Sequence, residues 1–182
     1  VGANIGIYSL FAALADDVEV YAFEPASSSY ASLCANINAN FLDDRIINLC
    51  MGFFDKTVLT ELSMSSIEAG GAVHDFGTLN SAFEPNFEVR PIQRTLVFSI
   101  DDFRKIYNLG PVNYLKVDVD CVEEEILYGA SQTLSDDTVR SILIEKRIDD
   151  AESNNRIIEF MEKHGFENRK EINDKHDMLF SR

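Results

Sequence analysis

Basic residues are scarce in this chain, and long apolar runs are absent. Sixteen Lys and Arg side chains stand against 31 Asp and Glu, which gives a formal net charge of −15 over 182 residues. Because cations that neutralise phosphates supply most of the affinity for nucleic acid, this balance argues against a nucleic-acid partner. No apolar run approaches the ~20 residues that a membrane-spanning helix needs, so we expect no membrane partner.

Cysteine is also sparse, and its spacing excludes a disulfide framework. The three cysteines, Cys34, Cys50 and Cys121, are odd in number and form no CxxC pair. Each lies in an apolar stretch, which predicts buried thiols in a reducing compartment and hence a cytoplasmic protein. The histidines lack metal-ligand spacing, so the sequence predicts no metal site.

Repeats and low-complexity linkers are absent as well, and strand and helix patterns alternate along the chain. This alternation predicts one α/β domain over residues 1–182 with a mainly parallel sheet. The expected helices cover residues 5–15, 27–40, 101–107, 123–134 and 157–164. The expected strands cover residues 18–23, 46–51, 57–64, 94–99, 114–119 and 141–144, with a closing antiparallel hairpin around 166 and 178–180. The segment 65–91 has no period, and its length is typical of a functional loop, which we expect to shape a ligand pocket.

A glycine turn opens the chain. Gly2 and Gly6 enclose Ala3, Asn4 and Ile5 directly before an apolar helix pattern. In a doubly wound fold this turn binds a nucleotide-like cofactor, because glycine lets the backbone approach the ligand and the helix start offers free N–H groups. Asn4 stands where the dinucleotide motif G-x-G-x-x-G has its second glycine. The spacing therefore disfavours NAD and favours a cofactor without a pyrophosphate.

An acidic residue follows the turn at the distance that cofactor binding requires. Glu24 ends the second expected strand, followed by Pro25. A carboxylate roughly twenty residues after such a turn can accept hydrogen bonds from ribose hydroxyls. Because a G-x-x-x-G spacing alone also occurs in ordinary helix packing, the cofactor hypothesis depends on the pairing of the turn with Glu24.

These motifs together resemble the FkbM-type methyltransferases. The matching runs are VGANIGIYSLFAA, VYAFEPASSSYASLCANINAN, YLKVDVDCVEEEILYGA and SILIEK. The resemblance implies a class I methyltransferase fold, Rossmann-like and doubly wound, that binds S-adenosylmethionine and methylates a hydroxyl of a sugar, polysaccharide or small natural product. It assigns Gly2, Ala3, Asn4 and Gly6 to the cofactor turn, Glu24 to the ribose and Asp55 to the adenine.

The chain departs from the family pattern in two places. In the family an acidic residue ends the first strand, just before the position of Val1, so we expect this strand to be largely missing here. The family has glycine where this chain has Cys121. Cysteine is strained there if the turn requires a positive φ.

Charged residues alternate along one expected strand. Lys116, Asp118 and Asp120 share a strand face because side chains alternate. Charges on a buried parallel strand must pair or reach the crevice at its carboxyl end, where ligands bind in such folds. Asp118 is therefore a candidate general base for the acceptor hydroxyl, with Lys116 positioning it; an internal Lys116–Asp118 salt bridge is the structural alternative. A divalent metal on Asp118, Asp120 and Glu145 is a further alternative that no spacing supports.

Three other titratable residues bear on the acceptor site. Glu145 ends the next strand at the same edge and is the third catalytic candidate. The acids that begin the helix at Glu123 suit the helix dipole, although Glu123 also matches a family position. His74 lies in the irregular segment, where a solvated loop histidine is a simpler interpretation than a catalytic base.

Two rival functions fit parts of the sequence. A nicotinamide-dependent dehydrogenase would share the turn but needs the missing glycine. A non-catalytic cofactor-binding module would explain Cys121 and the missing first strand.

Overall fold

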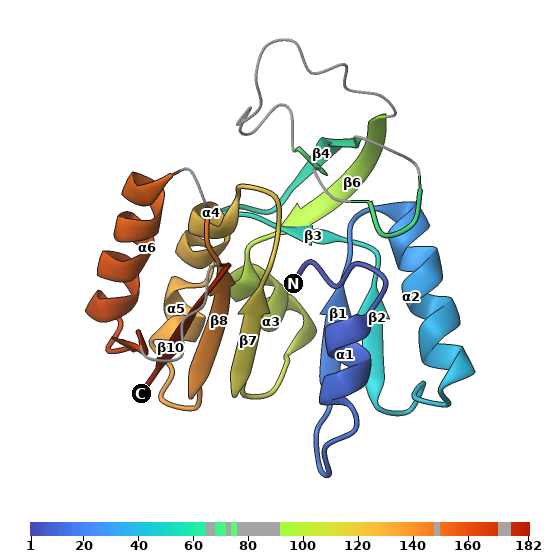
Figure 1. Cartoon of the computed structure of the whole chain (residues 1–182), viewed down its shortest axis with the longest axis horizontal. Coiled ribbons are helices and arrows are strands. Elements are labelled where there is room, and N and C mark those ends of the chain that lie inside the picture. Colours follow the sequence, from blue (N-terminus) through green and yellow to red (C-terminus); the bar gives the residue numbers. More distant parts are fainter. Residues whose placement is uncertain (65–67, 72–73, 76–91, 148–149, 171–175) are drawn as a thin grey trace. The chain divides into compact units, whose positions relative to one another are not determined.

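The computed structural model describes residues 1–182 apart from 65–67, 72–73, 76–91, 148–149 and 171–175 (Figure 1). The described chain forms two compact units. The first comprises Val1–Gly52 and Val58–Val97, and the second comprises Phe53–Thr57 and Phe98–Arg182.

The first unit begins with a helix that is followed by a β-α-β arrangement. Its elements are α1 Ile7–Ala12, β1 Val20–Phe23, α2 Ser27–Ala39 and β2 Ile46–Leu49. β1 and β2 pair in parallel, with Val20 opposite Ile46, as expected for strands joined by a helical crossover. Leu33 and Ile37 of α2 share a buried core with Ala22 and Ile46 of the strands. α2 therefore packs on this strand pair.

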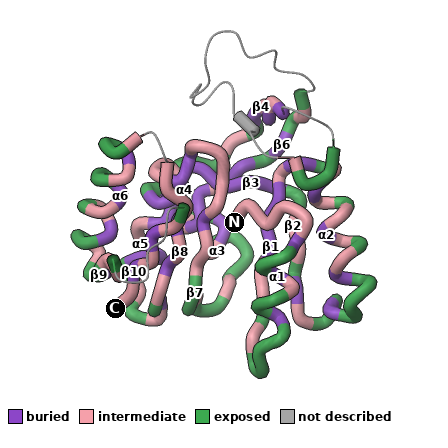
Figure 2. Tube along the Cα trace, in the orientation of Figure 1, coloured by how far each residue is buried: buried purple, intermediate pink, exposed green. Residues whose placement is uncertain are grey.

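α1 is shorter than the predicted helix 5–15. It begins after Gly6, which has a left-handed conformation, and its last turn is closed by tighter bonds from the N–H of Leu14 to the Phe11 carbonyl and from Ala15 to Ala12. Most of the large apolar side chains of this segment, including Phe11 and Leu14, are exposed (Figure 2). The apolar pattern predicted the helix, but tight hydrogen bonding ends it early.

An antiparallel arm completes the first unit. β4 Val58–Met64 pairs with β5 His74–Asp75 and with β6 Ile92–Phe98, and β3 Gly52–Phe53 joins β6 where the chain passes between units. We call β4, β6 and the described residues 68–71 the β4–β6 arm. Thr60 and Thr95 are buried opposite each other, whereas Leu59 and Leu96 on the other face are exposed. The arm therefore has one buried face and one exposed face, and the exposed face also carries the Glu61–Arg94 ion pair.

The second unit contains a mixed sheet in the order β7-β8-β10-β9. Its elements are α3 Ile100–Tyr107, β7 Tyr114–Val117, α4 Glu123–Tyr128, α5 Ser131–Leu134, β8 Ser141–Glu145, α6 Ala151–Lys163, β9 Glu167–Asn168 and β10 Asp177–Ser181. β7 and β8 are parallel, and β10 is antiparallel to both β8 and β9. The predicted closing hairpin is thus confirmed.

The helix predicted over residues 123–134 is divided into α4 and α5. The carboxylate of Asp101 accepts the backbone N–H groups of Gln132 and Thr133, both at 2.8 Å, and so caps α5 as a separate helix. Gly129 lies at the break, where a Cβ atom would collide with the carbonyl oxygen of Phe54. A contact distant in sequence therefore sets this boundary.

An α/β fold is confirmed, but the described strands are not mainly parallel. Parallel pairs occur at β1–β2 and β7–β8, whereas the pairs within the β4–β6 arm are antiparallel. Antiparallel strands need only a loop between them, and no helix pattern lies between β4 and β6. The doubly wound arrangement and the single domain remain predictions. Among the described residues, no helix is long and apolar enough to cross a membrane.

Candidate functional site

The glycine turn before α1 depends on left-handed backbone conformations. Gly2, Asn4 and Gly6 have φ angles of 72°, 50° and 97°. At Gly6 a Cβ atom would also lie 2.5 Å from Cδ1 of Leu33. A residue with a side chain is thus disfavoured at Gly6 both by the backbone conformation and by the packing of α2.

Glu24 binds this turn directly. The N–H of Asn4 donates to Oε2 of Glu24 at 2.8 Å, and the N–H of Ala26 donates to Oε1 at 2.8 Å. The backbone joins the same two segments, since the N–H of Ala3 donates to the carbonyl of Phe23 at 2.9 Å. Glu24 is only 4% exposed. The structure therefore brings together the turn and the acidic residue that the sequence paired.

Asn4 has an unmet hydrogen-bonding group. Its Oδ1 atom is buried and accepts no hydrogen bond from the described part of the chain. Buried acceptors are usually paired, so a ligand that donates from an amino or hydroxyl group fits this position. The neighbouring carbonyl of Ile5 accepts from Nδ2 of Asn36 at 2.8 Å, which holds the turn against α2.

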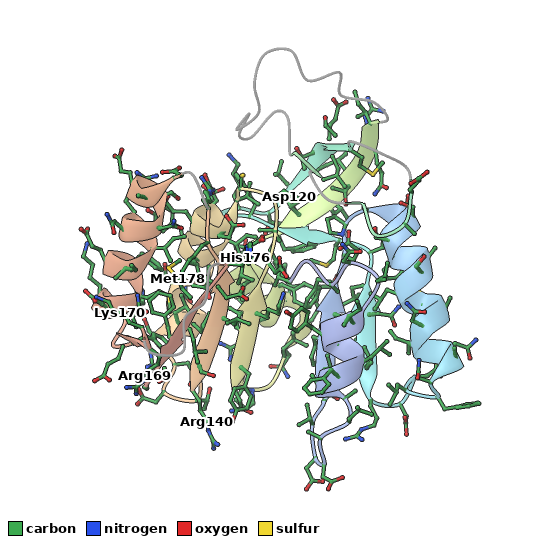
Figure 3. The ribbon with its side chains drawn as sticks, in the orientation of Figure 1. Asp120, Arg140, Arg169, Lys170, His176 and Met178 are labelled. Atoms are coloured by element: carbon green, nitrogen blue, oxygen red, sulfur yellow. The ribbon has the colours of Figure 1, made fainter. Side chains whose placement is uncertain are left out.

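The three predicted catalytic residues meet at the carboxyl ends of β7 and β8. Lys116 Nζ forms an ion pair with Oδ2 of Asp118, so the salt bridge expected as the structural alternative to a catalytic role is present. Glu145 ends β8 and forms a side-chain hydrogen bond with Asp118. Figure 3 labels Asp120 in the loop that follows β7. Two strands thus place one cation beside a carboxyl pair.

Crowding and burial hold a proton on Glu145. Burial raises its pKa to about 8, and the charge of Asp118, the hydrogen bond with Asp118 and the charges of Glu123 and Asp120 act in the same direction. Two adjacent carboxylates repel each other, so one proton shared between them is favoured. At neutral pH Glu145 is therefore a hydrogen-bond donor to Asp118.

Glu123 is more deeply buried than a helix-dipole role would require. It is 1% exposed at the start of α4, and burial raises its pKa to about 7 against the opposing effects of backbone N–H groups and Arg147. Arg147 Nε lies 3.2 Å from Oε2 of Glu123. The negative charge of this glutamate thus depends on Arg147.

The turn before α4 is strained as the sequence predicted. Cys121 has a φ of 66°, in the left-handed region, which is unfavourable for a residue with a Cβ atom. Its carbonyl oxygen accepts a hydrogen bond from Nη2 of Arg147. Burial raises the pKa of its thiol, although the Arg147 charge lowers it.

Comparison with known proteins identifies the family. The model of the methyltransferase FkbM domain matches residues 1–167. The chain belongs to this family. The FkbM domain described here also resembles the crystal structure of the methyltransferase FkbM from Methylobacillus flagellatus KT, with 17% identity and a TM-score of 0.62. All of this chain matches 42% of that one, so it spans less than half of the neighbour's length. No curated protein matches it.

For two other predicted residues of the FkbM domain, Asp55 and His74, the structure does not test the predicted role. Asp55 is exposed in the second unit, whereas the glycine turn belongs to the first, so its role at the adenine remains a prediction. His74 lies in β5 opposite Met64, but its side chain is outside the described part of the chain. Among the described residues no group of His, Cys, Asp or Glu is placed to hold a metal, so the alternative of Asp118, Asp120 and Glu145 gains no support.

The cysteines of the FkbM domain are all free, but not all are buried. Cys34 and Cys121 are partly buried, whereas Cys50 is exposed. The prediction of three buried thiols is therefore wrong for Cys50 and only partly met at Cys34 and Cys121. Cys50 follows the end of β2, where the sheet stops and the chain turns, so its apolar neighbours in sequence do not cover it.

Arg147 of the FkbM domain was missed by the sequence analysis. Besides Glu123 and Cys121, it lies 3.8 Å from Oε2 of Glu125 and 3.7 Å from Oδ2 of Asp150. It follows β8 by two positions and has no motif around it. The only available signal was the acidic start of α4, which needs a buried cation nearby if it is to remain charged.

Proposed function

We propose that the chain is an S-adenosylmethionine-dependent methyltransferase that transfers a methyl group to a hydroxyl of a sugar, polysaccharide or small natural product. The observation that carries the proposal is the 2.8 Å hydrogen bond from the N–H of Asn4 to Glu24. It joins the glycine turn to the acidic strand end in a chain of a methyltransferase family. The class I, doubly wound arrangement belongs to the same proposal.

The cofactor contacts follow from the turn. Gly2, Ala3, Asn4 and Gly6 would line the methionine part of the cofactor, with the buried Oδ1 of Asn4 accepting from its amino group. Glu24 would bind the ribose hydroxyls, and Asp55 the adenine. The side chain of Asn4 occupies the position where a dinucleotide motif has glycine, which disfavours NAD.

The second unit supplies the groups for acceptor chemistry. When bound, S-adenosylmethionine supplies a methyl group on a sulfonium centre. Asp118 accepts the proton of the acceptor hydroxyl as that oxygen attacks, Lys116 orients Asp118, and Glu145 donates a hydrogen bond to it. Alignment of the reacting atoms contributes most to the rate, and general base catalysis adds about 10²–10⁴-fold.

The free cysteines support a reducing, cytoplasmic setting.

A non-catalytic cofactor-binding module is the second candidate. The observation that favours it is the left-handed Cys121, at a position where the family has glycine. A strained turn next to Asp118 and Glu123 is compatible with a site that has lost its catalytic geometry.

Two measurements on full-length protein test these alternatives. Calorimetry should detect binding of S-adenosylmethionine and no binding of NAD. A coupled assay for released S-adenosylhomocysteine, run over a panel of sugars and small hydroxylated compounds, should detect turnover. Binding of NAD in place of S-adenosylmethionine would refute the proposal, and cofactor binding without turnover by any hydroxyl acceptor would favour the binding module.

A further inference from the structure

The side chain of Gln93 reaches from β6 to the bend that follows Glu24. Its Nε2 donates to the carbonyl of Pro25 at 2.7 Å, and its Oε1 accepts the N–H of Ser27 at 2.9 Å. Both ends of one amide are thus engaged by one short segment of backbone. A side chain held at both ends has little rotational freedom, so Gln93 fixes the bend rather than following it.

Gln93 adds to hydrogen bonds that the bend already has, since the N–H of Tyr30 donates to the carbonyl of Ala26 at 2.8 Å and Sγ of Cys50 lies 3.8 Å from the carbonyl of Pro25. Pro25 has no N–H to donate. The N–H of Glu24 donates to the carbonyl of Leu49 at 3.1 Å, and the N–H of Ala26 donates to the Glu24 carboxylate. The two contacts of Gln93 hold the carbonyl of Pro25 and the N–H of Ser27 on either side of Ala26. An anchor in the β4–β6 arm therefore holds the backbone on either side of Ala26, whose N–H binds the Glu24 carboxylate.

A second contact joins the β4–β6 arm to α2. The N–H of Gly70 donates to Oγ of Ser29, which is 1% exposed, at 3.2 Å. A Cβ atom on Gly70 would lie 3.7 Å from Cγ2 of Ile5 and 3.9 Å from Oδ1 of Asn4. The arm therefore forms hydrogen bonds with the bend at Pro25 and with Ser29 of α2, and Gly70 lies near the turn at Asn4.

We propose that Gln93 is a positioning residue that aims the Glu24 carboxylate at the cofactor's ribose from the β4–β6 arm. This inference rests on the proposed function, because it requires Glu24 to bind ribose hydroxyls. It extends that function by assigning the arm to cofactor selectivity. Gln93 touches no reacting atom, and its effect is on affinity and on the recognition of the ribose.

The variant Gln93→Met tests the proposal, because methionine has a similar length but makes neither hydrogen bond. We expect the Kd for S-adenosylmethionine to rise about three- to tenfold, the equivalent of one lost hydrogen bond. The preference for S-adenosylhomocysteine over its 2′-deoxy analogue should fall by a similar factor. A loss of fold stability alone would weaken both ligands equally, so the ratio distinguishes positioning from general damage.

A second variant and a control complete the design. Gln93→Glu keeps the acceptor for the N–H of Ser27 but sets a carboxylate oxygen against the carbonyl of Pro25, so the repulsion should weaken binding at least as much as Gln93→Met does. Gln132→Met makes the same change at an exposed position of α5 and should bind as wild type does.

The outcomes separate the two proposals. If wild-type protein does not bind S-adenosylmethionine, the proposed function fails and this inference fails with it. If wild type binds but both Gln93 variants retain its Kd and its ribose preference, only the role of Gln93 is overturned. An equal weakening of the two ligands would also overturn it, since Gln93 would then act on the fold alone.

Discussion

Two turns in this molecule handle negative charge in opposite ways. In the first unit, the buried Glu24 is bound by the backbone N–H groups of Asn4 and Ala26. In the second unit, Glu145 and Asp118 are hydrogen-bonded to each other, and other carboxylates lie close to them. The pKa of Glu145 therefore rises to about 8. N–H donors solvate a charge and suit recognition, whereas crowded carboxyl groups retain a proton and suit acid–base chemistry. The surroundings, rather than the residue type, divide these roles.

The same two turns also differ in which residue types adopt the left-handed backbone conformation. The turn before α1 uses glycine at two of its three left-handed positions, and asparagine, which tolerates this region, at the third. The turn before α4 uses Cys121. The first turn is thus relaxed and the second is strained, and Arg147 holds the second in place through the carbonyl of Cys121.

The largest effect is expected at the crowded turn. Asp118→Asn removes the proposed base while keeping the shape of the side chain, so kcat should fall about 10²–10⁴-fold with cofactor affinity unchanged. Release of S-adenosylhomocysteine measures the rate, and Asp43→Asn at an exposed position serves as the control. Undiminished turnover in Asp118→Asn would show that Asp118 is not the general base. The contrast between a recognition turn and an acid–base turn would then no longer hold.

The recognition side is tested at Glu24. Glu24→Ala removes the acceptor for the ribose and for the turn, so the Kd for S-adenosylmethionine should rise about ten- to a hundredfold, as expected for lost charge-assisted hydrogen bonds. Calorimetry gives the Kd, and thermal unfolding without ligand checks the fold. Glu162→Gln, on the exposed side of α6, should bind normally. Unchanged affinity in Glu24→Ala would make Glu24 a purely structural residue.

The raised pKa of Glu145 predicts a pH dependence of stability. Between its ordinary value of 4.5 and its folded value of about 8, the folded chain keeps a proton that the unfolded chain releases. This contribution to stability is therefore full below pH 4.5 and is lost as the pH rises towards 8, with a slope of at most about 1.4 kcal/mol per pH unit. Glu145→Gln, a mimic of the protonated form, should flatten the curve in urea unfolding from pH 5 to 9. Parallel curves for the two proteins would contradict the shared proton.

The smallest effect concerns backbone strain. Cys121→Gly should raise the free energy of unfolding by about 1 kcal/mol, because glycine adopts a φ of 66° without steric cost, partly offset by the greater freedom of glycine in the unfolded chain. Urea unfolding measures it, with Cys34→Gly in the middle of α2 as a counterpart that should lose stability. A loss of stability in Cys121→Gly would mean that the thiol contributes more through packing than its backbone costs.

Features with a local cause were predictable from the sequence. The glycine turn, the position of Glu24 and the Lys116–Asp118 pair follow from spacing along the chain, whereas the strain at Cys121 was expected from the family resemblance. Periodicity likewise placed most of the helices and strands, with errors at the ends of α1, at the division between α4 and α5, and at the start of α6, which begins at Ala151 instead of 157.

Features with a distant cause were not predictable. Gln93 and Pro25 are 68 positions apart, and Arg147 and Glu123 are 24 apart. A single polar side chain has no period that would mark its partner. The exposure of Cys50 escaped prediction for a similar reason, since burial at the end of a strand depends on which other segments cover it.

The absence of a side chain at Gly129 has a consequence for the exposed acid Asp55. The backbone at 129 passes so close to the carbonyl of Phe54 and to Cα of Asp55 that one added carbon would have to displace them. The location of that acid is therefore governed from 74 positions downstream. A single methyl group at this remote helix break, as in Gly129→Ala, would therefore move Asp55 without any change in the segment around Asp55 itself.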